Sequence, residues 1–185
     1  MGDILFAINL FSSCNMAYVS FYKGAKNAEG DILQKIWKLS NEELETRHNY
    51  IQYLFPTLKA SRYNIKAPQL TSDEVTQFRS SYILRQRLIY SFDMMMKFFG
   101  FVPVKSNNVH LYDYTSNIKP QWLTPANHNY LRMTRMMCSL KLFNIRQEAM
   151  MLFIALCHIN DKFPDQIDAG TLKIWADAVK DLLTR

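Results

Sequence analysis

Residues 127–140 read N-H-N-Y-L-R-M-T-R-M-M-C-S-L, an apolar stretch interrupted by cationic side chains. His128, Arg132 and Arg135 stand at positions i, i+4 and i+7, so a helix would place them along one side. No Asp or Glu occurs within residues 114–147. The cations of this segment therefore need acidic partners from elsewhere in the fold, or a ligand.

Helical patterns continue along most of the chain. Capping boxes at Ser40–Glu43 and Thr71–Glu74 predict two helix starts. We expect the first helix to end just before Pro56. The second should run to Phe99 as the longest helix, with Leu88 and Phe92 on its buried face. Further helices are predicted from Thr124, from Asn144, and over residues 3–13, 31–38 and 168–183.

The overall composition favours an all-α fold. With 5 Gly and 6 Pro in 185 residues, long regular elements are expected rather than a turn-rich β-sandwich. Residues 15–30 should be mostly irregular. Prolines and asparagines punctuate residues 101–122, which we expect to form one long loop. The prediction is a single compact domain of about six or seven helices with this one loop.

Charge and cysteine content limit the possible functions. A net charge of +6 favours attraction to polyanions without identifying one. Three unpaired cysteines indicate a reducing, intracellular compartment. No apolar run is long enough to span a bilayer. The histidines are scattered and no nucleophile signature occurs, so we predict no metal, no cofactor and no catalytic residue.

Two interpretations remain open for the arginines. They could hold a carboxylate or phosphate of a ligand, because guanidinium presents a planar fork of donors. They could instead tie the helix to acids such as Glu43, Glu45 or Asp93. A helical wheel places Arg135 near the apolar face and Arg132 on the other side. We therefore expect Arg135 to be structural and Arg132 to be the more accessible ligand contact.

Aromatic residues before Pro56 offer a second possible surface. Tyr50, Tyr53 and Phe55 could line a groove for an aromatic-containing peptide, since amphipathic rings serve interfaces well, or could belong to the core. Gln52 is expected to be a buried hydrogen-bonding residue that holds the turn before Pro56.

Five segments carry a family resemblance. They are, in order, Phe21–Lys23 with Asn27–Gly30 and Trp37, then His48–Pro56, Asn64–Phe78, Phe92–Gly100 and His128–Leu140. Together they resemble the conserved region of the opioid growth factor receptor family over about residues 20–160. Animal members bind a short enkephalin peptide at the nuclear envelope and restrain proliferation. The resemblance implies a non-catalytic regulatory domain, nuclear, perinuclear or cytoplasmic, that binds a peptide or protein.

Residues 1–185 are accordingly predicted to be one domain, with the helices at 3–13 and 168–183 packed on the family-like region. The predicted partner-binding residues are His128, Arg132, Arg135, Tyr50, Tyr53 and Trp37. The alternative is a nucleic-acid-associated protein that uses the basic segment from residue 119 to 146. Its contacts would come from Lys119, Arg132, Lys141 and Arg146.

Overall fold

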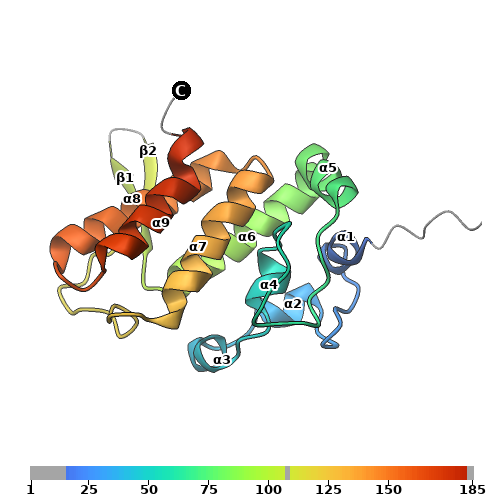
Figure 1. Ribbon diagram of the computed structural model, residues 1–185, viewed down its shortest axis with the longest axis horizontal. Coiled ribbons are helices and arrows are strands. Elements are labelled where there is room, and N and C mark those ends of the chain that lie inside the picture. The colour runs from blue at the N-terminus through green and yellow to red at the C-terminus, as the bar shows by residue number, and fades with distance from the viewer. Residues whose placement is uncertain (1–15, 107–108, 183–185) are drawn as a thin grey trace, which may run out of the picture.

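The computed structural model describes residues 16–106 and 109–182. Within these ranges the chain is mostly helical, which confirms the predicted fold class (Figure 1). The predicted helix at 3–13 lies outside the described residues. The elements in chain order are α1 (Ala17–Tyr22), α2 (Leu33–Ile36), α3 (Asn41–Thr46), α4 (Ile51–Leu54), α5 (Ser72–Ser80), α6 (Tyr82–Phe98), β1 (Val102–Ser106), β2 (Val109–Asp113), α7 (His128–Leu142), α8 (Arg146–Lys162), α9 (Ala169–Val179) and the 3-10 turn η2 (Lys180–Leu182).

Both predicted capping boxes are present, but neither opens a helix as long as expected. The helix capped by Ser40 ends at Thr46, because Arg47 adopts an extended conformation with φ −80° and ψ 134°. The chain then re-enters a helix at α4. The break leaves the carbonyls of Glu45 and Arg47 free to accept hydrogen bonds from Arg132 of α7. The single helix predicted from Ser40 to Phe55 is therefore divided into α3 and α4, at the point where Arg132 of α7 binds the backbone.

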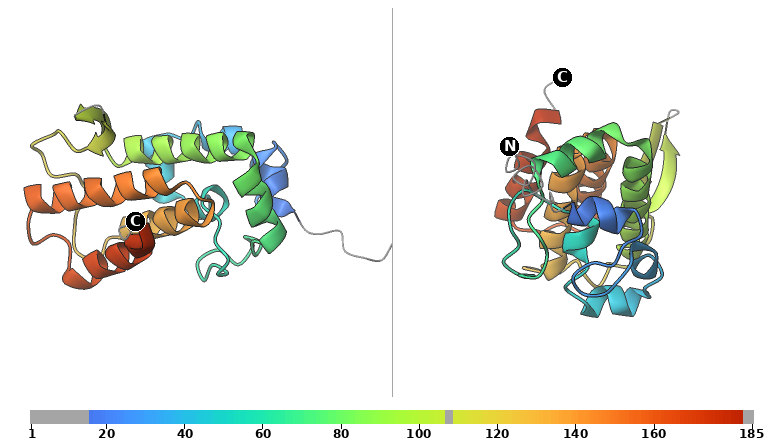
Figure 2. Two further views of the ribbon diagram at one scale, coloured as in Figure 1. Left: turned by 90° about the horizontal axis from the view of Figure 1, so that it is seen from above. Right: turned by 90° about the vertical axis from the view of Figure 1, so that its right-hand side faces the viewer.

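A serine divides the second predicted helix. Ser81 has an extended ψ of 113°, and its hydroxyl accepts a hydrogen bond from the Leu84 amide. Serine competes with the helical backbone in this way and serves well as an N-cap. As a result α5 ends at Ser80 and α6 starts at Tyr82, at a steep angle to it (Figure 2).

Two local predictions are wrong. The expected loop at 101–122 contains an antiparallel hairpin, in which Val104 of β1 pairs with Leu111 of β2. Its β-branched and aromatic residues favour strands, and the hairpin packs on α8. Helix α7 starts at His128 with Asn127 as its cap, three residues beyond the expected cap at Thr124. The stretch 15–30 is mostly irregular over its described residues, as predicted, although it includes α1.

The buried apolar side chains of the described residues form one hydrophobic cluster. Helix α7 runs through the middle of the molecule and packs on α8 and α9 (Figures 1 and 2). Leu88 and Phe92 of α6 are completely buried, which confirms the predicted inner face. Glu74 is also buried, because its carboxylate accepts from the Tyr18 amide at the start of α1 as well as from Thr71. The capping box of α5 therefore also anchors α1.

Candidate binding groove

Arg132 lies at the junction of three chain segments. Its side chain is only 4% exposed. One terminal nitrogen donates to Asn129 Oδ1 at 2.9 Å. The other donates to the carbonyls of Arg47 at 2.9 Å and Glu45 at 3.3 Å, and lies 3.3 Å from His48 Nδ1. The prediction that Arg132 would be the more accessible arginine is therefore wrong, since its side chain is buried and protein acceptors bind both terminal nitrogens.

Glu45 supplies the acidic partner that the helix lacks. Its carboxylate lies 3.2 Å from His128 Nε2 and 3.9 Å from Arg132 Nη1, and it accepts from Asn129 Nδ2 at 3.1 Å. The other two acids proposed for this role are used elsewhere. Glu43 completes the cap of α3, and Asp93 accepts from the Tyr112 hydroxyl. For Arg132, the structural interpretation accounts for the contacts.

The charge balance around His128 favours its neutral form. Burial lowers the pKa of His128, and the nearby Arg132 lowers it further. Glu45 raises the pKa of His128. His48, whose ring stands edge-on to that of His128 at 5.3 Å, lowers it. His128 therefore takes up a proton less readily than a free histidine would.

Arg135 lies one turn further along α7 in a different environment. Its Nε donates to the Phe55 carbonyl at 2.8 Å, and Ser139 donates to the next carbonyl, that of Pro56, at 2.8 Å. The two terminal nitrogens of Arg135 make no hydrogen bond or ion pair within the part of the chain that the structure describes. Burial lowers the pKa of the Arg135 guanidinium. Arg135 is thus a half-buried cation without an acid.

A groove of 520 Å³ runs between α4, with the chain that follows it, and α7. Ile51 and Leu131 give it aliphatic walls, and Leu131 is 55% exposed. Figure 1 shows α4 and the segment after it alongside α7. The groove brings together three of the predicted residues, His128, Arg132 and Arg135. Its other lining residues are His48, Gln52, Thr57, Lys59, Ser61, Tyr63, Thr134 and Cys138.

Gln52 is the most unusual side chain of this groove. It is 4% exposed, as the sequence suggested, but its Oε1 accepts no hydrogen bond from any described residue. The expected role in holding the turn before Pro56 is therefore wrong. Arg135 and Ser139 hold that turn instead. Most buried polar atoms are paired, so an unpaired amide oxygen in a residue that lines a groove is exceptional.

The other predicted partner-binding residues do not line the groove. Tyr50 and Tyr53 are each 1% exposed, and their hydroxyls donate to the carbonyls of Leu44 and Lys66. Burial raises the pKa of both phenols. Trp37 packs against α6, where its indole donates to Ser91 Oγ and its ring lies 4.5 Å from that of Tyr90.

The basic residues of the alternative nucleic-acid site are separated from one another. Lys119 precedes α7 and binds Gln166 Oε1 at 2.7 Å. Lys141 and Arg146 flank the other end of α7. Arg132, between them, is buried. The segment therefore does not present one continuous basic strip.

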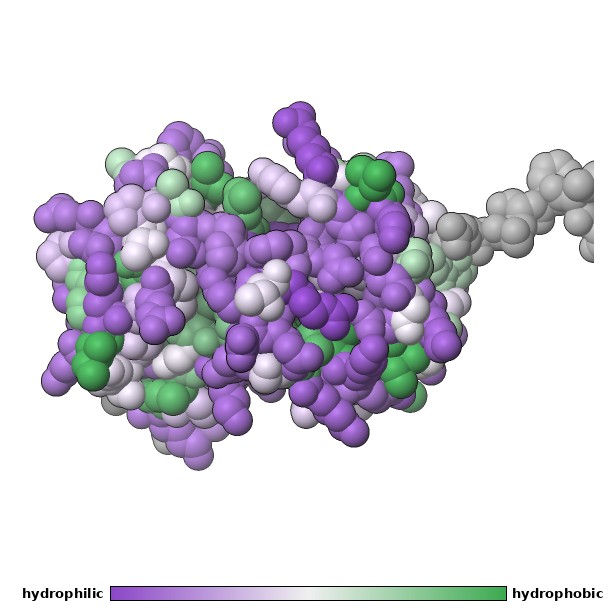
Figure 3. Space-filling view, turned by 90° about the horizontal axis from the view of Figure 1, so that it is seen from below, coloured by the Kyte–Doolittle hydropathy of each residue, from purple (hydrophilic) through white to green (hydrophobic). Residues whose placement is uncertain are grey.

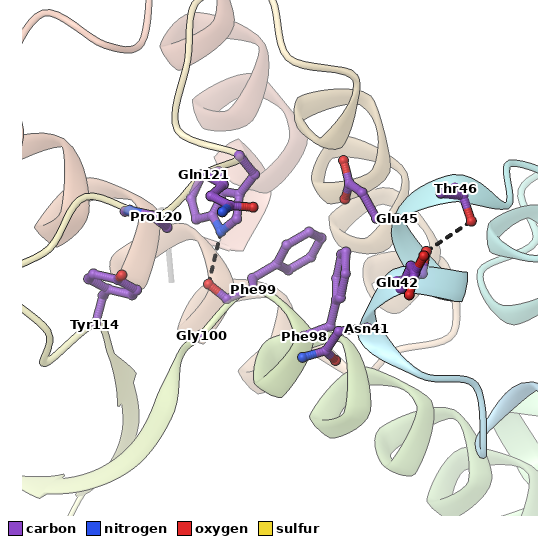
Figure 4. A pocket seen from close by; sticks show the side chains of 11 residues that line it. Asn41, Glu42, Glu45, Thr46, Phe98, Phe99, Gly100, Tyr114, Pro120 and Gln121 are labelled. Carbon is purple, nitrogen blue, oxygen red and sulfur yellow. Dashed lines mark hydrogen bonds between the residues drawn. The ribbon is translucent and has the colours of Figure 1, made fainter.

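A second hollow, also 520 Å³, lies on the other side of Glu45 (Figure 4). The rings of Phe98 and Phe99 lie between α3 and the segment that ends at Trp122. The hydrogen bonds drawn in Figure 4 join groups of the protein to each other, such as the Trp122 indole, which donates to the Phe99 carbonyl. In the described residues, Gln52 alone has a buried side-chain oxygen or nitrogen without a partner, and it lines the groove between α4 and α7.

Two further properties of the described residues bear on function. No group of three histidine, cysteine or acidic side chains is placed to hold a metal ion there. None of the helices in those ranges has both the length and the apolar character needed to cross a bilayer. Figure 3 shows the underside of the molecule, which is mainly hydrophilic with small, separate apolar patches. That face offers no broad apolar surface.

These features define a mostly helical domain whose notable site is a narrow groove with unpaired polar groups. The chain belongs to the opioid growth factor receptor family, since the model of the opioid growth factor receptor conserved region matches residues 12–185. It is 37% identical to the opioid growth factor receptor of Mus musculus over 137 residues, which cover 69% of this chain. It is 31% identical over 183 residues, 91% of the chain, to opioid growth factor receptor-like protein 1 of Xenopus tropicalis.

The alignments cover only part of these relatives. The matched region is 21% of the mouse receptor and 33% of the frog protein. No solved structure matches the chain.

Proposed function

We propose that this domain is a non-catalytic regulatory module that binds a peptide or protein segment in the groove between α4 and α7. One observation carries the proposal. A guanidinium without an acid, Arg135, and a buried amide oxygen without a donor, Gln52, line the same groove. Both residues need what a polypeptide supplies, namely acceptors and N–H donors.

The energetics favour a ligand over an empty groove. A buried polar atom left unsatisfied costs about 1–3 kcal/mol, and rotation of the Gln52 amide toward the groove would let a donor from a bound segment recover this. A carboxylate or carbonyl placed against Arg135 would gain a charge-assisted hydrogen bond. Ile51 and Leu131 would cover the apolar part of the same segment. Binding would thus combine apolar burial with two polar contacts that fix orientation.

The relatives support this type of function. Their names describe receptors or receptor-like proteins, not enzymes. The matched region is a minor part of each relative, so their names alone do not assign a receptor activity to this chain. Such an activity belongs to the proposal. The same proposal places the protein inside the cell, in the nucleus or the cytoplasm. Arg132 and His128 then serve as a rigid wall of the groove, held by Glu45.

Site-specific photo-crosslinking tests the proposal. A benzophenone amino acid at Leu131, in the groove, should crosslink a partner in cells that express the protein. The matched control is the same group at Ile174 of α9, which is 54% exposed but does not line the groove. Adding Arg135→Ala to the Leu131 probe should remove most of the crosslinked product.

Mass spectrometry of the product identifies the partner class. A peptide adduct from Leu131 that disappears with Arg135→Ala supports the proposal. Equal adducts from Leu131 and Ile174, or adducts that persist in Arg135→Ala, would contradict it. A nucleic-acid adduct would favour the alternative ligand, and binding should then weaken steeply with salt through counterion release.

A further inference from the structure

We infer that the groove continues past Cys138 into a basic hollow at the C-terminal end of α7, and that it accommodates an extended, acidic polypeptide segment. The inference rests on the proposed function and adds the chemical class of the partner. The basic hollow measures 420 Å³ and shares two lining residues, Thr57 and Cys138, with the groove. Its other lining residues are Leu58, Arg79, Lys141, Leu142, Arg146, Asp181 and Leu182.

Positive charge dominates the combined surface. Apart from the buried Arg132, the lysines and arginines that line it are Lys59, Arg79, Arg135, Lys141 and Arg146. Asp181 is the one acid among the lining residues, and it lies 3.4 Å from Lys141. Because the Asp181 side chain is 82% exposed, water screens this pair strongly. Most of the positive charge is therefore available to a ligand.

Several of these cations have free donors. Arg79 uses Nε to bind the Leu142 carbonyl, which covers part of the negative end of α7. Arg146 is exposed and makes no side-chain hydrogen bond with the described residues. Cys138 links the two hollows. Burial raises the pKa of its thiol, while Lys141 and Arg135 both act to lower it, which places both cations near the junction.

The walls fit a polypeptide better than a nucleic acid. The apolar side chains that line the two hollows are mostly aliphatic; the aromatic rings are those of Tyr63 and of His48 and His128, which stand edge-to-face against each other. Bases bind single-strand sites mainly by stacking on aromatic rings. Aliphatic walls alternating with cations fit a segment in which apolar and acidic side chains alternate. An extended chain presents such side chains to opposite faces.

The length of the surface sets the length of the segment. His128 and Leu142 mark its two ends on α7, and the helix rises about 1.5 Å per residue, so the surface extends about 21 Å. An extended strand rises about 3.3 Å per residue, so about six residues fill it. Arg135 would bind the first half of this segment, and Lys141 with Arg146 the second half.

A position-scanning library of synthetic octapeptides tests the inference. We expect wild-type protein to select Asp or Glu at alternate positions, separated by apolar residues. In Lys141→Ala/Arg146→Ala, binding of the selected peptides should fall by roughly fivefold to tenfold, as expected for two partly exposed ion pairs. The matched control is Lys23→Ala/Lys38→Ala, which removes the same charge from exposed positions outside the groove. This control should bind like wild type.

Alkylation of the cysteines gives a local readout on the same samples. A peptide across the junction should slow alkylation of Cys138 at least fivefold and leave Cys157 on α8 unchanged. Peptides that bind in an Arg135-dependent way without acidic selection would overturn the inference and leave the proposed function standing. Absence of any peptide binding would overturn both. Tighter binding of oligo(dT), lost in Lys141→Ala/Arg146→Ala, would assign the surface to nucleic acid and overturn the inference.

Discussion

Replacement of Arg132 by alanine should destabilise the fold and not act mainly on binding. Arg132 donates to the carbonyls of Glu45 and Arg47 and to Asn129, in a site that is 4% exposed to solvent. Loss of the guanidinium leaves those two carbonyls without any other donor among the described residues. The ion pair with Glu45 adds little, because that carboxylate is 44% exposed.

The expected loss of stability follows from the carbonyls of Glu45 and Arg47, which would lose their donor. Each unsatisfied buried acceptor costs about 1–3 kcal/mol, and water entering from the exposed Glu45 side would reduce this. We expect Arg132→Ala to lower the free energy of unfolding by about 3 kcal/mol. For a domain of this size, that corresponds to a fall in Tm of about 6–12 °C. Arg132→Lys should recover only part of it, because one ammonium cannot reproduce the planar fork.

Thermal melts followed by circular dichroism measure this effect. Arg62→Ala is the matched control, since Arg62 is exposed and its side chain makes no hydrogen bond or ion pair with the described residues. Arg135→Ala should cost only about 1 kcal/mol, the value of its single hydrogen bond to the Phe55 carbonyl. An Arg132→Ala protein that melts within about 1 °C of the Arg62→Ala control would refute the reasoning.

Three further predictions follow from the core, the groove and the charge balance. Leu88→Ala and Phe92→Ala should each destabilise by about 2–5 kcal/mol in denaturant melts, because both side chains are fully buried. Gln52→Leu should stabilise the fold by about 1–2 kcal/mol, because it removes an unsatisfied buried oxygen, yet should weaken peptide binding; a loss of stability would show that the oxygen has a partner. The lowered pKa of His128 means that the unfolded state binds its proton more readily, so Tm should decrease as pH falls through the ordinary value of 6.5. His128→Asn should reduce this pH dependence, and an unchanged profile would contradict the assignment.

Local signals in the sequence predicted the helical class and several helix ends. The capping boxes at Ser40 and Thr71 need only residues three positions apart, so they can be recognised without knowledge of the fold. The buried face of α6 followed from its spacing. The break at Arg47 did not, because it depends on hydrogen bonds from Arg132, which lies 85 residues away.

The exposure of the two arginines was predicted in the wrong order for a related reason. The helical wheel took Leu131 as a marker of the buried face, yet Leu131 is 55% exposed. Helix α7 is covered on several sides, so its buried sector also includes the polar residues Asn129 and Ser139. Arg132 lies in that sector and Arg135 at its edge. A single amphipathic stripe cannot describe a helix in this central position.

The groove was only partly predictable. His128, Arg132 and Arg135 were identified because the segment lacks acids. Gln52 was noted as buried, but its missing partner depends on the packing of α4 against α7. Nothing in the local pattern indicated Lys59, which is brought in by the chain after α4.

The central claim is that Arg135 contacts a partner segment in the α4–α7 groove. The most direct test is isothermal titration of the peptide recovered from the Leu131 crosslink, with wild-type protein, Arg135→Ala and Arg62→Ala. Loss of a charge-assisted hydrogen bond of about 1.5–3 kcal/mol predicts that Arg135→Ala binds at least tenfold more weakly, while Arg62→Ala binds like wild type. Equal affinities of Arg135→Ala and wild type, with both proteins folded, would contradict the claim.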